Sequence, residues 1–423
     1  MKKLSVLLLA LMLVISSFTV ATAEAASNKL TVWCWDPAFN IYAMNEAAKV
    51  YQETHPDFVL EVIETPWNDL QAKLTTLAMS GDLSGMPDIF LCQDNAFQKN
   101  VINYPDLFAD LTSGGVDFSK FPAAKVAYSV VDGKNYGVPF DNGTTVQAMR
   151  TDILEQAGYT IADLTDITWD RFIEIGKDVK AKTGLPMISG TSGEPDLVMI
   201  MLQSCGSSLF NADGTLNIKD NAALKKVMEN FATMVKEGVY AEANGWDGYI
   251  GTFTTGNCVG TINGCWILGS IQTAADQSGK WALTNIPKVD IEGGTNYSNN
   301  GGSSWAVSGS SKNYELANDF LAATFGGSVK FYETILPSSG ALATYLPAGD
   351  SDVYNQPSEY FGGQKVFADI TAYAASVPAN ATGVYYYEAR DAVATAITQV
   401  LGGADIDAAL AEADATVSFQ MGA

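Results

Sequence analysis

Five short segments together supply aromatic side chains and amide, carboxylate or guanidinium groups. A sugar ring has an apolar C–H face that an aromatic ring can cover, and a rim of hydroxyls that Asp, Glu, Asn and Arg can each bond more than once. These residue types therefore have the chemistry needed to bind a carbohydrate. The segments are Trp35–Asp36, Asp94–Asn95, Glu194, Asn263–Gly264–Cys265–Trp266, and Tyr385–Tyr386–Tyr387 with Arg390.

Most hydrolytic, metal and nucleotide chemistry requires residues that this sequence lacks. His55 is the only histidine, and we expect it on the surface because it precedes Pro56 at the predicted end of a helix. A histidine-dependent nucleophile and a histidine-based metal site are therefore disfavoured. No G-x-x-x-x-G-K-[ST] loop and no G-x-G-x-x-G after a strand occurs, so ATP hydrolysis would have to come from another chain. We expect no enzyme activity, no cofactor and no metal site.

Two other functions stay open on the residues alone. A secreted glycoside hydrolase needs only two carboxyl groups a fixed distance apart, and the sequence has 47 acidic residues among which no pair stands out. A ferric-iron-binding protein is the second alternative, because adjacent tyrosines such as Tyr385 and Tyr386 suggest iron ligands.

The first 25 residues have the layout of a secretory signal peptide. Met1-Lys2-Lys3 precedes an apolar stretch, residues 4–15, and small residues lead to Ala25. The stretch is shorter than the ~20 residues that cross a bilayer. We expect export to the periplasm or the extracellular space as a soluble protein, and no lipid anchor is evident because the nearest cysteine, Cys34, lacks the small residues required before it.

The composition is that of an acidic globular protein. The net charge is −23, and removal of the signal peptide leaves 22 basic and 46 acidic residues, which gives −24. Nucleic acid and anionic membranes are therefore unsuitable partners.

The cysteines are odd in number and form no Cys-x-x-Cys, so each is expected to act as a small buried apolar residue. Cys34 and Cys92 lie near strand ends and could pair. The five are Cys34, Cys92, Cys205, Cys258 and Cys265.

Apolar periodicity predicts alternating strands and helices at the start of the chain. Residues 30–35, 58–63 and 87–92 are strand-like, and residues 40–54 and the segment around Leu70, Leu74 and Leu77 are helical. This βαβαβ rhythm indicates an α/β fold with a mostly parallel sheet flanked by helices. Ligands of such sheets bind beyond the carboxyl ends of the strands, where Trp35, Asp36, Asp94 and Asn95 are placed.

The chain is long enough for two lobes, and two glycine-rich stretches are expected to cross between them. Residues 136–143 and 292–302 are these crossings, each followed by a strand, and Thr168 is expected to cap a helix that begins at Trp169. A further helix covers residues 389–400, and Trp33, Trp169 and Trp281 are expected in the core. The predicted lobes are 26–141 with 300–345, and 142–299 with 346–423.

The sequence resembles the family 1 extracellular solute-binding proteins of ABC sugar importers, the group that includes the maltose/maltodextrin-binding proteins. The most specific match is Asn263-Gly264-Cys265-Trp266, which is similar to the family's Asn-Gly-x-Trp pattern. The resemblance spans the mature chain. Its segments are Leu30–Trp33 with Asp36, Pro87–Phe90 with Asp94, Tyr136–Pro139, Ala148–Asp152, Gly260–Trp266, Leu316–Leu321 and Tyr385–Arg390.

The resemblance implies the two-lobed periplasmic-binding-protein fold, with a ligand cleft at the hinge. It also implies a carbohydrate ligand that is delivered to membrane permease subunits served by a separate ATPase, and a monomeric chain. Pro37 and Asn95 stand where maltodextrin binders have basic residues, so maltodextrin itself is disfavoured.

The resemblance also assigns roles within the cleft. Asp36 and Asp94 would accept hydroxyl bonds from one lobe and Glu194 from the other, while Trp266 and Tyr386 would stack on sugar rings. For three positions, two roles remain open. Arg390 could reach the ligand or form a salt bridge, and Asn142 and Ser303 could serve either the hinge or the ligand.

Overall fold

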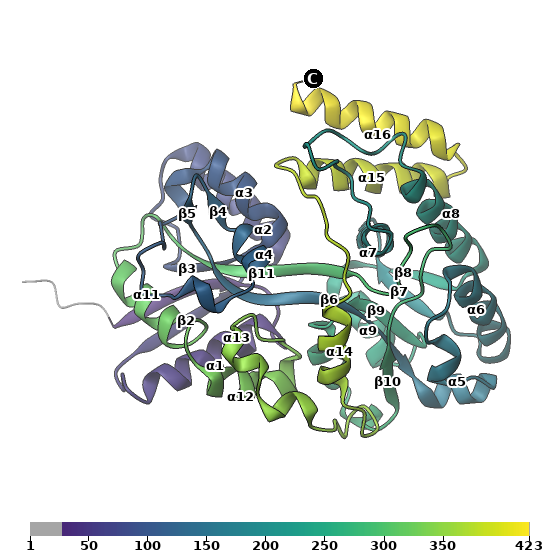
Figure 1. Cartoon of the computed structure of the whole chain (residues 1–423), viewed down its shortest axis with the longest axis horizontal. Coiled ribbons are helices and arrows are strands. Elements are labelled where there is room, and N and C mark those ends of the chain that lie inside the picture. Colours follow the sequence, from purple (N-terminus) through teal and green to yellow (C-terminus); the bar gives the residue numbers. More distant parts are fainter. Residues whose placement is uncertain (1–27, 423) are drawn as a thin grey trace, which may run out of the picture.

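The computed structural model describes residues 28–422, and the predicted signal peptide lies outside this range. The described chain forms two α/β lobes joined by two long strands (Figure 1). The crossing strands, β6 (Val138–Arg150) and β11 (Asn299–Val307), pair with each other in antiparallel fashion. One sheet therefore runs through both lobes, in the order β2-β1-β3-β11-β6-β9-β7-β8, with β10 beside β6.

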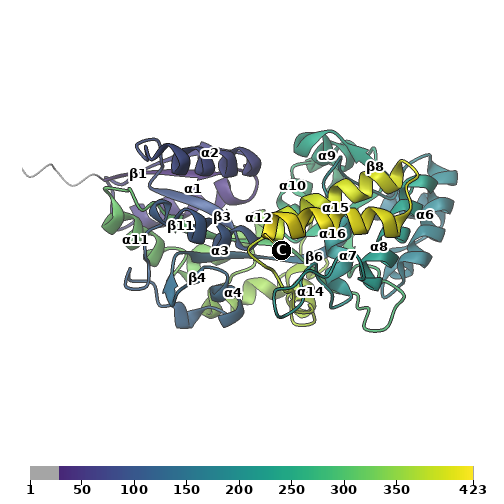
Figure 2. The same cartoon turned by 90° about the horizontal axis from the view of Figure 1, so that it is seen from above.

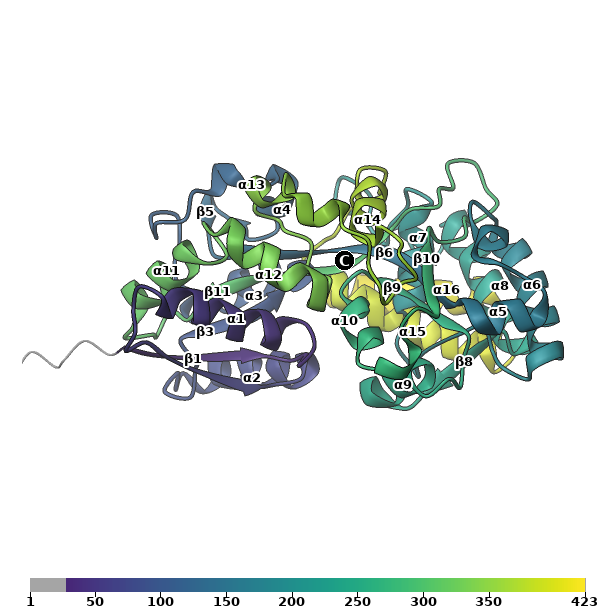
Figure 3. The ribbon, with the colours of Figure 1, turned by 90° about the horizontal axis from the view of Figure 1, so that it is seen from below.

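The first lobe begins with the predicted alternation of strands and helices. Strand β1 pairs in parallel with β2 and β3, which confirms the βαβαβ prediction. The bounds are β1 Lys29–Cys34, α1 Asn40–Gln52, β2 Val59–Glu64, α2 Trp67–Ser80, β3 Ile89–Gln93, α3 Asp94–Asn103, α4 Ala123–Ala127, β4 Val130–Val131, β5 Lys134–Asn135, α11 Tyr314–Ala323, α12 Val329–Ser339 and α13 Leu346–Gly349. Helix α12 lies between α1 and α10 (Figure 3).

The second lobe repeats the same architecture. Strand β7 is parallel to β8 and β9, and the Thr168 hydroxyl accepts the backbone N–H of Arg171 at 3.2 Å, which confirms the predicted cap of α6. The bounds are α5 Thr151–Ala157, α6 Trp169–Thr183, β7 Ile188–Thr191, α7 Asp196–Ser204, α8 Ala222–Glu237, β8 Tyr240–Ala243, α9 Gly245–Thr254, β9 Gly260–Gly264, α10 Ile267–Gln272, β10 Trp281–Thr284, α14 Val366–Ala374, α15 Tyr386–Leu401 and α16 Ile406–Met421. Helices α15 and α16 lie side by side on this lobe (Figure 2).

The first crossing already belongs to a strand from Val138 on, whereas the sequence analysis expects a strand only after the glycine-rich residues. Pro139 and Gly143 are incorporated into β6 because the pairing with β11 shifts register between Ser303 and Ser304, and a bulged strand tolerates proline. At Gly143 a Cβ would lie 1.8 Å from the Asn300 carbonyl oxygen. Glycine is thus required there because the two crossing strands approach too closely for a side chain.

The apolar core is divided into clusters, and one of them joins Leu336 of α12 to Ile267 of α10 and Trp281 of the second lobe. Trp33, Trp169 and Trp281 are buried, as predicted. His55 is exposed, and its ring stacks on Tyr51 with centroids 4.0 Å apart. The lobe bounds stay a prediction, because β6 and β11 contribute to both lobes.

All five cysteines are free, so the pairing considered for Cys34 and Cys92 does not occur. Four of them are buried, and Cys205 is partly exposed. Burial raises the pKa of the Cys34 and Cys92 thiols, so both stay protonated and unreactive.

Candidate ligand-binding site

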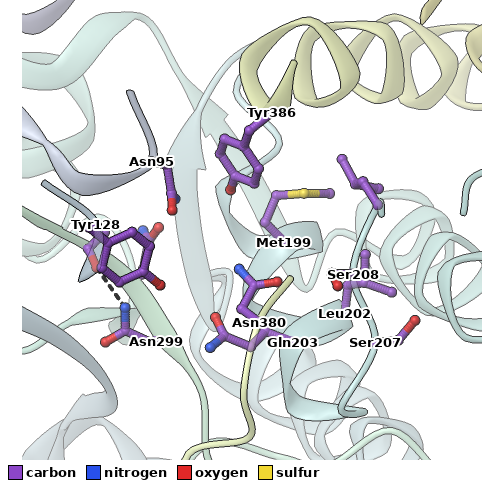
Figure 4. A pocket seen from close by; sticks show the side chains of 13 residues that line it. Asn95, Tyr128, Met199, Leu202, Gln203, Ser207, Ser208, Asn299, Asn380 and Tyr386 are labelled. Carbon is purple, nitrogen blue, oxygen red and sulfur yellow. Dashed lines mark hydrogen bonds between the residues drawn. The ribbon is translucent and has the colours of Figure 1, made fainter. Parts of the chain in front are cut away.

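A hollow of about 480 Å³ lies between the lobes beside the crossing strand β11. Every polar side chain that lines it is an amide, a hydroxyl or a phenol, and none is charged; we name it the amide pocket. Asn95, Tyr128 and Tyr386 point into it (Figure 4). Its lining consists of Asn95, Tyr128, Met199, Leu202, Gln203, Ser207, Ser208, Leu209, Asn299, Asn300, Gly301, Asn380 and Tyr386.

A second hollow, of about 370 Å³, lies at the carboxyl ends of β7 and β9; we name it the strand-end pocket. The structure brings Glu194 and Asn263 together in its wall, and Trp266 adjoins it through Trp246, with ring centroids 5.7 Å apart. Its lining consists of Ile188, Ser189, Gly190, Thr191, Glu194, Asp196, Leu197, Tyr240, Trp246, Tyr249, Ile262 and Asn263.

Asn300 connects the two pockets. Its side-chain Nδ2 donates to Asn263 Oδ1 at 2.7 Å, and its carbonyl oxygen accepts the Trp266 Nε1–H at 3.0 Å. Asn263 also donates to the Tyr249 hydroxyl at 3.0 Å. One hydrogen-bonded chain thus fixes the Trp266 ring and spans both pockets.

The glycine of the Asn-Gly-x-Trp pattern has a steric role. A Cβ at Gly264 would lie 2.2 Å from Trp266 Nε1. The indole folds back over the strand end, so only glycine leaves room for it in this position.

Arg390 forms a salt bridge, one of its two predicted roles. Its guanidinium Nη2 donates to Glu194 and, at 2.7 Å, to Asp196 Oδ1, and its side chain is mostly buried. Although burial lowers the pKa of Arg390, Asp196 and Glu194 raise it above its ordinary value. The guanidinium therefore stays charged and fixes the Glu194 carboxylate beside the strand-end pocket.

Asp36 folds back on the loop that follows β1. Its Oδ1 accepts the backbone N–H groups of Ala38 at 2.8 Å and Phe39 at 3.1 Å. Burial raises the pKa of this carboxyl to about 6. The neighbouring Trp35 ring lies 5.4 Å from the ring of Trp67, so the loop presents an aromatic surface beside a buried acid.

Asp94 lies in a buried ionic network instead of an open loop. Lys125 donates to its carboxylate and also to the Ser303 carbonyl oxygen at 2.9 Å, and the Ser304 hydroxyl donates to it at 3.0 Å. The backbone N–H of Ser303 donates to Asp141 at 2.9 Å. We name this set, Asp94, Lys125, Asp141, Ser303 and Ser304, the hinge network, because it joins α3 and α4 to both crossing strands.

Burial raises the pKa of both carboxyl groups of the hinge network. The pKa of Asp141 rises to about 6, and that of Asp94 is raised although Lys125 lowers it. Two acids thus share one buried ammonium group. Asn142, the other residue predicted at this crossing, is partly exposed in β6, and its carbonyl oxygen accepts the Cys265 thiol at 3.3 Å.

The sequence analysis missed several residues of this region, among them Asn300, Trp246 and Lys125. Trp246 is 39% exposed at the start of α9, and its signal was an isolated tryptophan between Gly245 and Gly248. Lys125 is 4% exposed, and its signal was a single lysine among apolar residues. Neither sequence pattern identifies the residue that the side chain contacts, Trp266 for Trp246 and Asp94 for Lys125.

Within residues 28–422, no group of three or more His, Cys, Asp or Glu side chains is arranged to hold a metal ion. The adjacent rings of Tyr386 and Tyr387 are perpendicular. Their hydroxyls have different surroundings, since Tyr387 donates to Gln93 and Tyr386 faces the amide pocket.

Among residues 28–422, every helix is too short or too polar to span a membrane.

Known proteins resemble this chain over nearly its full length. A lactose-binding protein from Rhizobium radiobacter is 41% identical over 92% of each chain, and an arabinooligosaccharide-binding protein from Bacillus subtilis (strain 168) is 28% identical over 77% of each. The ABC transporter associated binding protein of B. animalis subsp. lactis, solved in complex with β-1,6-galactobiose, shares the fold, with a TM-score of 0.78 and 20% identity over 93% of this chain and 96% of that one. The family model described as "Bacterial extracellular solute-binding protein" matches residues 46–330, and the chain belongs to this family.

Proposed function

We propose that this chain captures a neutral carbohydrate of two or more rings between its lobes and delivers it to the permease of an ABC importer. The observation that carries the proposal is the pair of pockets connected through Asn300 and Asn263. Two neighbouring hollows that are connected in this way suit a ligand longer than one ring.

Each part of the site has a separate role in this proposal. Trp266 and Trp246 cover the apolar face of one ring, and Asn263 and Asn300 bond its hydroxyls. Glu194, fixed by Arg390, accepts further hydroxyl bonds in the strand-end pocket.

The amide pocket and the first lobe complete the proposed site. Tyr386 and Asn95, with the other amides of the pocket, hold the next ring. Trp35 and Asp36 contribute from the first lobe, and Asn142 lies at the edge of the crossing. In contrast, we assign Asp94 and Ser303 to the hinge network.

The relatives agree with a neutral oligosaccharide as the ligand, since the names of two of them specify lactose and arabinooligosaccharides. The lobes have the bounds predicted above, except that α13 belongs to the first lobe. They close over the ligand by hinge bending, and the permease recognises the closed form. The mature chain acts as an exported monomer without a lipid anchor and releases its ligand chemically unchanged.

Isothermal titration with matched neutral and acidic sugars tests the proposal. Lactose, an arabinooligosaccharide and a galactobiose should include at least one ligand with saturable binding. A uronic-acid counterpart of that ligand should bind at least about tenfold more weakly, because its carboxylate would face Glu194 and Asp196 and an uncharged amide pocket. Equal or tighter binding of the acidic sugar would contradict the proposed site.

A further inference from the structure

The first turn of α15, in the second lobe, contacts the first lobe through residues that adjoin the pockets without lining them. Lys99 of α3 forms an ion pair with Glu388, and the Tyr387 hydroxyl donates to the Gln93 side chain. The rings of Tyr387 and Trp67 also lie close together, with centroids 6.3 Å apart. Figure 1 shows the start of α15 beside α3.

The Lys99–Glu388 pair is more protected from water than most ion pairs of this chain. Its side chains are 25% and 23% exposed, whereas those of the Lys225–Asp407 pair are 42% and 62% exposed. The second carboxylate oxygen of Glu388 is buried and has no hydrogen-bond partner among residues 28–422. A pair in such surroundings is screened less by solvent and salt than a surface pair.

We infer that Lys99, Glu388, Gln93 and Tyr387 form an interlobe latch that sets ligand affinity by stabilising the closed state. None of the four lines either pocket. Because a ligand's apparent affinity scales with the population of the binding-competent conformation, a contact made only between closed lobes tightens binding without touching the ligand. These are therefore positioning residues, and the inference rests on the proposed binding function.

The latch has a signature that a ligand contact would not have. Removing the latch should weaken the binding of every carbohydrate by the same factor, since the lost stabilisation comes from a contact within the protein. The change should appear mainly in a faster dissociation rate, because the ligand can leave only after the lobes open and the latch holds them together. A residue that touches sugar would instead change the ratio of affinities between ligands.

The test uses Lys99→Met, Glu388→Gln and the double variant of the mature chain. Each single variant should weaken the affinity for two different bound sugars about fivefold, by an equal factor, and the double variant should weaken it by little more. Small-angle scattering without ligand should show a larger radius of gyration for the variants. Lys225→Met is the matched control, because its partner Asp407 belongs to the same lobe, and it should behave as wild type.

The latch would be overturned if both single variants kept the wild-type affinity, dissociation rate and radius of gyration. It would also be overturned if the loss of affinity differed between the two sugars. The proposed function fails in a different way, through absence of carbohydrate binding by the wild-type chain. In that case the scattering comparison still decides the latch, because it requires no ligand.

Discussion

Replacing Lys125 by methionine should lower the free energy of unfolding by about 3 to 5 kcal/mol near neutral pH, the usual cost of removing one partner of a buried ion pair. Lys125 is 4% exposed, and the two carboxylates it serves, Asp94 and Asp141, are 5% and 2% exposed. Without the ammonium group, two negative charges share a dry site. Urea unfolding followed by circular dichroism measures the change.

The loss should depend on pH in a defined direction. Both carboxyl groups already have folded-state pKa values above their ordinary value, with Asp141 at about 6, and removal of Lys125 raises these pKa values further. A raised folded pKa means that the folded chain binds protons more tightly than the unfolded chain, so stability rises as the pH falls from above 6 toward 4. The variant should therefore recover part of its stability in mild acid.

Two variants control this prediction. Lys330→Met removes a lysine that is paired with Glu53 and 66% exposed, and it should change stability by less than about 1 kcal/mol. Adding Asp94→Asn to Lys125→Met should restore part of the loss, because it removes one of the uncompensated charges. An unfolding midpoint of Lys125→Met equal to wild type at neutral pH would show that the hinge network does not exist.

Replacing Trp266 by alanine should weaken carbohydrate binding about 10- to 150-fold, the equivalent of about 1.5 to 3 kcal/mol for a large covering side chain. The indole lies beside Trp246 and bonds the Asn300 carbonyl, so alanine removes the ring and leaves Asn300 without this donor. Titration calorimetry with the tightest ligand measures the effect.

Trp266→Phe separates the two contributions, since it keeps an aromatic face and loses only the N–H donor. It should lie between wild type and the alanine variant. Trp281→Phe is the matched control, because Trp281 is buried in the core of the second lobe and should affect stability but not affinity. Unchanged affinity in Trp266→Ala would remove this tryptophan from the site.

The sequence predicted what depends on local pattern. Strands β1, β2 and β3, the Thr168 cap and the buried tryptophans follow from spacing and composition within short windows. The Asn-Gly-x-Trp segment was identified from its resemblance to a family, and the structure adds the physical reason for its glycine, the contact with the Trp266 indole.

What the sequence did not predict depends on contacts between distant residues. Asp94 is separated from Lys125 by 31 positions and Lys125 from Ser303 by 178, so no local window indicates that the aspartate is neutralised. The strand at the first crossing was expected only after residue 143, because the glycines and the proline break strands in isolation, whereas pairing with β11 overrides this tendency and β6 begins at Val138. Helix α16 was missed because its alanine-rich sequence carries no single apolar stripe.

The most direct test of carbohydrate capture is the melting temperature of the mature chain against a panel of neutral mono- and oligosaccharides, followed by recovery of the sugar. A ligand that binds only the folded state stabilises it by RT ln(1 + [L]/Kd), ~2.7 kcal/mol at 100 times Kd. A clear rise for a di- or oligosaccharide that is recovered intact is the predicted result. A flat panel, or recovery of a cleaved sugar, would contradict the proposal that this chain is a carbohydrate-binding transport protein.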